Sequence, residues 1–291
     1  MANDVLAPFR VRRITYNHSE RGVVMQSQNG PCPLIAIANL LSLRGQADLS
    51  SINEITAHQL CNLVGEIIMT TSNDADDDAV TDIILKQLPT LVRGLDVNVR
   101  FDSIVSFEKT AEMNVFDRLG IVLVHGWLAD PADAPVYDAV AHLYYNELVV
   151  KAVRTPKRSL VDENFKDDLI RDYLQETLSQ LTPTGLDALH SVQVDEPCIL
   201  FRNNHFSTLI RRDDAIFLLV TDESFMDMKD IVWEKLDSVT GATAFVDAAF
   251  RPVSFADEFS FLEARRRSSL YVTKGDNEEP PQSGLPGCIS Q

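Results

Sequence analysis

The spacing of hydrophobic and polar positions divides the chain into a β-rich beginning, a helical middle and a second β-rich region. Two apolar-rich runs flanking a polar turn predict a β-hairpin over residues 9–16 and 21–26. Apolar residues at helical spacing predict helices over about 33–43, 54–70, 77–88, 137–152, 163–180 and 185–191. Alternating or continuous apolar runs predict strands over 95–101, 121–124, 198–201, 205–210 and 215–221. These elements together predict the α+β fold class.

Composition indicates a globular protein with one unusual segment. Of its 291 residues 45% are hydrophobic and 24% charged, and the length suits one large domain, which we expect over residues 1–272. A mixed helical segment is expected from beyond Asp257 to Arg267. From Lys274 on, Gly, Pro, Ser and acidic residues cannot support a packed core, so residues 273–291 are expected to form a flexible C-terminal tail.

Charge and cysteine usage limit the partners and the cellular location that we expect. A net charge of −17 disfavours nucleic acid or an anionic membrane and suits a partner with a basic surface, although it can also serve only solubility. The N-terminus has no apolar signal core, and no apolar stretch is long enough to span a membrane. The four cysteines lack CxxC or disulfide-framework spacing, which predicts no metal site and a reducing compartment, cytoplasmic or nuclear.

Cys32 has the setting of a thiol nucleophile. It lies where the Gly30-Pro31 turn meets an apolar helix, and a helix start offers unpaired N–H groups and partial positive charge. Such a setting predicts a thiol pKa lowered to roughly 3.5–7.5. Gln26 would supply the side-chain amide of an oxyanion hole, with Gln28 as a rival. The alternative is that Cys32 is a small hydrophobic core residue.

His205 is the best candidate for the base, because it opens a strand directly after a turn-forming pair of asparagines. If the following hairpin turns near Asp213, His205 lies opposite residue 221 or 222, so Asp222 can orient the imidazole ring. The competing candidates are Ser207 and Asn203 for the orienting group and His125 for the base.

Several segments, in their order and spacing, resemble the MINDY family of deubiquitinating cysteine proteases. They are Gln26 through Leu41, Asp96 through Phe101, His125 through Leu128, Tyr145 through Leu148, Gln180 through Thr182, Phe201 through Thr208, Val220 through Asp222, and Val232 through Glu234. The similarity covers roughly residues 9–250 and suits a papain-like cysteine protease plan with several added helices. In that plan the nucleophile stands at a helix N-terminus and the histidine on a β-hairpin.

The resemblance implies a cysteine-type deubiquitinase that hydrolyses isopeptide bonds in polyubiquitin, with preference for lysine-48-linked chains. Cys32 would be the nucleophile, His205 the base and Gln26 the oxyanion donor, and no cofactor or metal would be needed. Four apolar or aromatic residues match positions that hold the distal ubiquitin in the family, namely Val97, Trp127, Tyr145 and Phe201. Such groups commonly dominate interfaces, but Val97 and Phe201 could equally be core residues.

Two departures from the family pattern keep other functions open. After Asp222 the chain has Glu223-Ser224-Phe225 where a glutamine-glycine pair is expected, and the tail lacks ubiquitin-interacting helices. One alternative is therefore a catalytically weak or inactive ubiquitin-binding module of the same fold. Another is a papain-like enzyme that acts on a different isopeptide.

The last four residues, Cys288-Ile289-Ser290-Gln291, have the C-a-a-X form of a prenylation signal. Ser290 weakens the match, the upstream residues are acidic, and a prenyl group alone would give only a weak lipid anchor. An incidental cysteine in a loose tail is the alternative, and Arg265-Arg266-Arg267 is most simply a solvated helix face.

Overall fold

The computed structural model describes residues 7–27, 30–71, 78–154, 161–240 and 244–255, and it has a mixed α+β fold. The strands are β1 (Phe9–Tyr16), β2 (Ser19–Val24), β3 (Glu54–Ile55), β4 (Leu123–His125), β5 (Cys198–Arg202), β6 (His205–Arg212), β7 (Ala215–Leu219), β8 (Trp233–Lys235) and β9 (Phe245–Val246). They form a three-stranded sheet in the order β2-β1-β3 and a six-stranded sheet in the order β4-β5-β6-β7-β8-β9. Only the β4–β5 pair is parallel among these described ladders.

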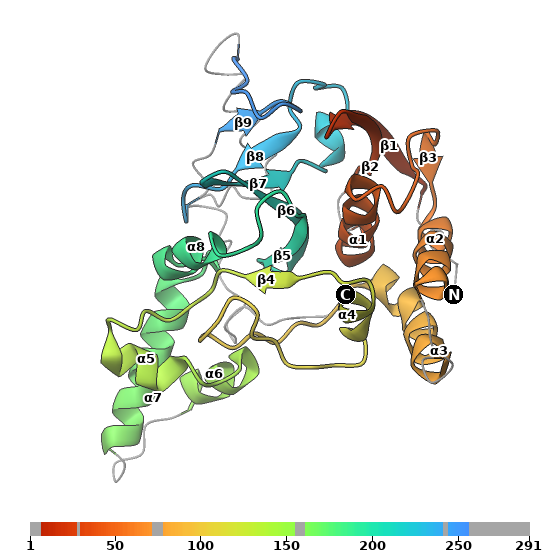
Figure 1. The fold of residues 1–291 in the computed structure, drawn as a ribbon. Helices are drawn as coiled ribbons and strands as arrows, with labels where there is room; N and C mark the ends of the chain where they lie inside the picture. The colour runs from red at the N-terminus through yellow and green to blue at the C-terminus, as the bar shows by residue number, and fades with distance from the viewer. Residues whose placement is uncertain (1–6, 28–29, 72–77, 155–160, 241–243, 256–291) are drawn as a thin grey trace.

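The helices gather in two groups, one beside the three-stranded sheet and one beside the β4 end of the six-stranded sheet (Figure 1). They are α1 (Cys32–Leu43), α2 (Ala57–Thr70), α3 (Asp78–Gln87), α4 (Asn114–Arg118), α5 (Ala134–Val140), α6 (Tyr145–Ala152), α7 (Val161–Glu176) and α8 (Pro183–Leu189), with 3-10 turns η2 (Leu88–Arg93) and η3 (Glu223–Phe225). Helix α1 packs against both β2 and β6, so it lies between the two sheets.

Helix α1 is fixed in place by its own polar residues as well as by its apolar ones. Every residue of α1 after Cys32 is buried. The Asn39 side chain accepts from the Val24 N–H at 2.7 Å and donates to the Val24 carbonyl at 3.0 Å, and Ser42 Oγ donates to Gly22 O at 2.7 Å. On the other side, Thr208 Oγ1 donates to Ala36 O at 3.3 Å. Because buried polar groups need partners, these bonds fix how α1 is oriented against β2 and β6.

The predicted hairpins are confirmed. Strands β1 and β2 pair from Tyr16–Ser19 onward across a turn in which Asn17 and His18 have φ of 47° and 61°. Strands β5, β6 and β7 form consecutive antiparallel pairs, as the apolar runs predict. Asparagine and aspartate tolerate positive φ better than most residues, which explains Asn17 in the first turn, Asn203 and Asn204 between β5 and β6, and Asp213 between β6 and β7.

Two predicted elements are wrong. Residues 95–101 form no strand, only isolated bridges between Val99 and Phe107 and between Arg100 and Tyr144. Their alternation reflects burial of every second side chain without a ladder. The helix predicted over 137–152 is divided into α5 and α6, because Tyr144 has the extended φ and ψ of an N-cap and starts a new helix.

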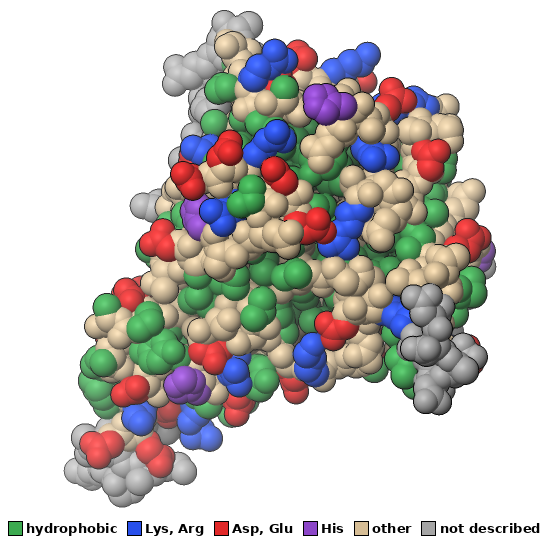
Figure 2. All heavy atoms as spheres, in the orientation of Figure 1, with side chains coloured by type: hydrophobic (Ala, Val, Ile, Leu, Met, Phe, Trp, Pro, Cys, Tyr) green, Lys and Arg blue, Asp and Glu red, His purple; other side chains and the backbone are tan. Residues whose placement is uncertain are grey.

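Charged side chains of both signs are interspersed over the face drawn in Figure 2, so the net charge of −17 forms no single acidic field on that face. No described helix is long and apolar enough to cross a membrane. The helical segment predicted to end at Arg267, the tail over 273–291 and Cys288 lie outside the described residues, and the assignment of residues 1–272 to one domain stays a prediction.

Candidate active site

Cys32 is the first residue of α1, directly after the N-cap residue Pro31, as the sequence predicts. Its N–H donates to Gly30 O at 2.8 Å, which closes the turn before the helix. Cys32 is only partly buried although the rest of the helix is fully buried. The thiol therefore stands at the one end of a core helix that approaches the surface.

His205 is the first residue of β6 and pairs with Arg202 across a two-residue turn. Asn203 and Asn204 in that turn have φ of 51° and 56°, the pattern of a type I′ hairpin. The backbone of Phe206, the residue after His205, and the side chain of Gln26 both act on the Cys32 thiol and lower its pKa. The structure thus brings the thiol, the start of β6 and Gln26 to one place.

Gln26 is connected to Asp222 as well as to Cys32. Gln26 and Asp222 form an isolated parallel bridge. In this bridge the Gln26 N–H donates to Thr221 O at 2.6 Å, and Gln26 O accepts from the Glu223 N–H at 2.9 Å. The Gln26 side chain donates from Nε2 to Gly30 O at 3.2 Å. The rival Gln28 lies outside the described residues.

The register of the β6–β7 hairpin predicts a position for Asp222 opposite His205. Strands β6 and β7 pair Leu209 with Leu218 and Arg212 with Ala215, and extending this register beyond the end of β7 places His205 opposite residue 222. Asp222 caps η3, since its Oδ1 accepts from the Ser224 N–H at 2.8 Å and from the Ser224 hydroxyl. The carboxylate also acts electrostatically on His205.

Burial sets the protonation states of the candidate pair. Desolvation raises the pKa of the Cys32 thiol, and the bonds from the Phe206 N–H, its own N–H and Gln26 oppose that rise without reversing it. The prediction of a lowered thiol pKa is therefore wrong for the free chain. Desolvation lowers the pKa of His205 to about 4, against a raising effect of Asp222. At neutral pH the pair is a thiol and a neutral imidazole, and a neutral imidazole can accept a proton.

The four residues predicted from the resemblance to contact ubiquitin are buried in the free chain, each with 4–6% of its surface exposed. Trp127 contacts Tyr145 at 5.4 Å between ring centroids, and its Nε1 donates to Thr177 Oγ1 at 2.7 Å. Phe201 contacts Phe206 at 5.1 Å between ring centroids. Phe201 thus contacts the residue that follows His205, and the contact of the four residues with ubiquitin stays a prediction.

The competing candidates for the base and for the orienting group, His125, Asn203 and Ser207, have other contacts in the structure. His125 is 1% exposed, its Nδ1 accepts from the Trp127 N–H at 3.2 Å, and burial lowers its pKa to about 4. The Asn203 N–H donates to Gln180 Oε1 at 2.9 Å, so Asn203 holds the turn before β6. Ser207 lies on β6 opposite Leu200, and no described contact connects it to the His205 ring.

Two buried arginines near the site were missed by sequence reasoning. Arg202 donates to Ser179 O at 2.8 Å and Val239 O at 2.9 Å and so anchors the turn before His205. Arg12, on β1, bonds the segment that contains Asp222. The only signal that could indicate them is an arginine inside an apolar strand pattern, and that signal does not reveal its partners.

A groove of about 850 Å³ lies away from the site, between α2 and the α3–η2 segment. Cys61 is part of its lining, whereas Cys32, His205, Gln26 and Asp222 are not. The described residues contain no cluster of three or more His, Cys, Asp or Glu side chains that could hold a metal ion.

The chain combines a mixed α+β fold with a partly buried thiol at a helix start, and the backbone of Phe206, the second residue of the strand that begins with His205, acts on that thiol. These features suit a thiol hydrolase. The comparison with known families identifies the group: the chain belongs to the MINDY deubiquitinase family, whose model matches residues 7–250.

Individual relatives agree with this assignment. The chain is 39% identical over 250 residues to ubiquitin carboxyl-terminal hydrolase MINDY-1 of Bos taurus, covering 82% of this chain and 53% of the relative. It is 39% identical over 262 residues to MINDY-1 of Danio rerio, covering 84% and 49%. It is 38% identical over 267 residues to MINDY-2 of Homo sapiens, covering 84% and 41%. The chain thus spans about half the length of these relatives.

Proposed function

We propose that this chain is a cysteine-type deubiquitinase of papain-like plan that hydrolyses isopeptide bonds in polyubiquitin, with preference for lysine-48-linked chains. The observation that carries the proposal is the meeting of Cys32, at the start of α1, with the Gln26 side chain and the start of β6 in a chain of the MINDY family. The linkage preference rests on the family resemblance alone.

In the proposed reaction His205 accepts the proton of the Cys32 thiol, and the sulfur attacks the carbonyl carbon of the isopeptide bond. The oxyanion that forms is held by the Gln26 amide and the backbone N–H of Cys32. The imidazolium then protonates the departing lysine amine as the C–N bond breaks. Water, deprotonated by His205, attacks the thioester, and the ubiquitin carboxylate and the Cys32 thiol are released.

The free chain is poised for proton transfer and does not contain a preformed ion pair. A raised thiol pKa and a lowered imidazole pKa both favour the neutral forms. The thiolate would form when the substrate carbonyl is in place and His205 takes the proton. Asp222 supports this step, because a carboxylate near the ring stabilises the imidazolium.

Val97, Trp127, Tyr145 and Phe201 are proposed to hold the distal ubiquitin. Trp127, Tyr145 and Phe201 belong to aromatic clusters that join the α6 region to β5 and β6. Since all four residues are buried in the free chain, direct contact requires local opening of this cluster. Their side chains can also support the surface that ubiquitin touches.

The proposal is tested by a gel assay of wild type and Cys32→Ala with pentameric ubiquitin chains of several linkages. We expect wild type to cleave lysine-48-linked chains and Cys32→Ala to cleave none. Cys61→Ala is the matched control, because Cys61 is also half-buried but lines the distant groove. Equal cleavage of ubiquitin chains and unrelated isopeptides by wild type would contradict the proposal that polyubiquitin is the substrate.

A ubiquitin-binding module without turnover is the second candidate. The observation that favours it is the raised pKa of the Cys32 thiol, together with the divergent residues Glu223-Ser224-Phe225 after Asp222. Retained binding of ubiquitin chains by wild type, with no cleavage of any linkage, would support this candidate over the first.

A further inference from the structure

Arg12 is a buried arginine on β1 with 4% of its surface exposed. Its guanidinium donates to three backbone carbonyls: Nη1 to Phe225 O at 3.1 Å and to Ile231 O at 3.0 Å, and Nη2 to Val220 O at 3.0 Å. Burial lowers its pKa to about 10. Burial of a cation costs free energy unless the cation is hydrogen-bonded. These three bonds therefore compensate for the burial of the Arg12 guanidinium.

The three carbonyls belong to one segment, residues 220–231, which joins β7 to β8. Val220 lies just before Asp222, Phe225 ends η3, which Asp222 caps, and Ile231 lies just before β8. The segment is thus folded around a single guanidinium. Among the ion pairs of the described residues Arg12 has no carboxylate partner, so its role is to bind backbone and not to neutralise an acid.

The 220–231 segment also contacts the candidate site, through Gln26. Gln26 bonds it on both sides of Asp222, through Thr221 O and the Glu223 N–H. The Met25 N–H donates to Arg10 O at 2.8 Å. This bond connects the residue before Gln26 to β1, two positions from Arg12. A displacement of the 220–231 segment would therefore move Asp222 relative to His205 and Gln26 relative to Cys32.

We infer that Arg12 is a positioning residue for the proposed reaction: its guanidinium holds the 220–231 segment against the N-terminal hairpin, so that Asp222 faces His205 and Gln26 stays beside Cys32. This inference rests on the proposed function. Three carbonyls converge on one planar fork, a geometry that the rigid guanidinium satisfies better than a single ammonium group.

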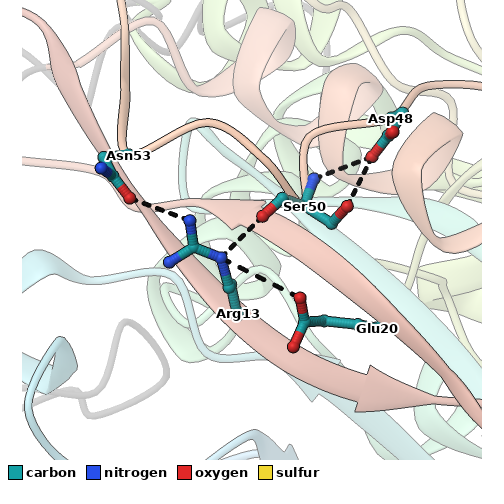
Figure 3. A network of polar contacts seen from close by, with 5 residues as sticks. All are labelled: Arg13, Glu20, Asp48, Ser50 and Asn53. Carbon is teal, nitrogen blue, oxygen red and sulfur yellow. Dashed lines mark hydrogen bonds and ion pairs between the residues drawn. The ribbon is translucent and has the colours of Figure 1, made fainter.

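Arg13 provides a matched control from the same strand. It is the next residue but points to the opposite face of β1, where its side chain is 43% exposed. Its Nε donates to Ser50 O at 2.6 Å, its Nη2 donates to Asn53 Oδ1 at 2.9 Å, and Glu20 lies 4.0 Å away (Figure 3). This network holds the hairpin to the segment before β3 and does not reach residues 220–231.

The experiment compares Arg12→Lys, Arg12→Met, Arg13→Lys and Arg13→Met in the full chain. The first measurement is kcat and KM for lysine-48-linked chains, and the second is the titration of the His205 ring by NMR. We expect kcat of Arg12→Met to fall about 10- to 100-fold with KM within about twofold, because small misplacements of catalytic groups have effects of that size. Arg12→Lys should recover part of the loss, and both Arg13 variants should behave as wild type.

The titration separates this inference from the proposed function. If Arg12 holds Asp222 near the ring, its loss removes the Asp222 effect and lowers the His205 pKa further, whether or not the chain cleaves ubiquitin. If wild type cleaves no ubiquitin chain but the His205 pKa is lower in Arg12→Met than in wild type, the proposed function is contradicted and the positioning of Asp222 by Arg12 is supported. A folded Arg12→Met with wild-type kcat and an unchanged titration would overturn the inference. If Arg12→Met does not fold, Arg12→Lys decides by the same two measurements.

Discussion

Gln26 and Asp222 lie side by side in a parallel bridge, although they come from opposite ends of the described chain. The bridge connects the segment before helix α1 to the segment after strand β7. Two groups proposed for different tasks, the oxyanion donor and the residue that orients histidine, therefore share one backbone connection. Movement at either one is transmitted to the other.

Substitution of Gln26 tests its role at the oxyanion. Gln26→Ala keeps the backbone bonds of the bridge and removes only the amide, so kcat should fall roughly 10²- to 10³-fold. Steady-state kinetics with lysine-48-linked chains measure this, and Gln46→Ala, at an exposed position after α1, is the control. A loss of less than about threefold would assign the oxyanion to other donors.

Two histidines, the buried His125 and the partly buried His205, predict acid sensitivity of the fold. Burial lowers the pKa of His205 and of His125 to about 4, whereas an unfolded histidine titrates near 6.5. Between these values the unfolded chain binds more protons, so the free energy of unfolding falls as the pH falls. With about 1.4 kcal/mol per pKa unit, each histidine removes on the order of 3 kcal/mol by pH 4.

Urea unfolding between about pH 6.5 and 5, above most carboxylate titrations, measures this slope. His205→Asn should reduce the slope, and His142→Gln, at an exposed position, should leave it unchanged. A stability that stays constant over this interval would mean that both histidines are accessible to protons in the native state.

Trp127 is expected to matter first for stability. Trp127→Ala removes a ring that contacts Phe101, Tyr145 and Tyr173, and it should lower the free energy of unfolding by about 3–5 kcal/mol. Phe165→Ala, an aromatic residue with 58% of its surface exposed, should change it by less than about 0.5 kcal/mol.

The same position separates ubiquitin binding from folding. Trp127→Phe keeps the ring contacts and loses the bond to Thr177, which is worth about 1 kcal/mol. If Trp127→Phe is folded and binds ubiquitin as wild type does, the indole makes no required contact with ubiquitin. Chemical unfolding and a binding titration of the same samples give both answers.

Gly185 of α8 should tolerate no side chain. A Cβ there would overlap the Gly126 carbonyl, a backbone group at the end of β4 that cannot rotate away. Gly185→Ala should therefore lower the midpoint of urea unfolding strongly. Gly65→Ala, inside α2, meets only Leu85 and Leu88 at 3.4 and 3.5 Å and should stabilise the helix by about 0.5–1 kcal/mol. Equal midpoints for the two variants would contradict the close approach of α8 to β4.

Local sequence patterns were sufficient for the elements that carry the site. The turn before Cys32, the asparagines before His205 and the hairpin turn at Asp213 are all short-range features, and the structure places each of them as predicted. The missing strand at 95–101 shows the limit, since burial of alternate side chains there comes from packing and not from a ladder.

Features that depend on the whole fold could not be predicted. Burial raises the pKa of the Cys32 thiol and outweighs the hydrogen bonds that lower it, and burial is a property of the whole fold. The contacts of Arg12 join β1 to carbonyls near the far end of the chain, and nothing in the residues around Arg12 indicates them. The thiol pKa and the contacts of Arg12 could not be predicted because both depend on residues that are far apart in the sequence.

Cys32 is proposed to be the nucleophile that attacks the carbonyl carbon at the ubiquitin C-terminus. The most direct measurement uses a ubiquitin probe with an electrophile in place of its C-terminal carboxylate, followed by peptide mass analysis of the adduct. We expect one ubiquitin on wild type, attached to Cys32, and none on Cys32→Ala. An adduct on Cys61 or Cys198, or equal labelling of Cys32→Ala, would contradict the account.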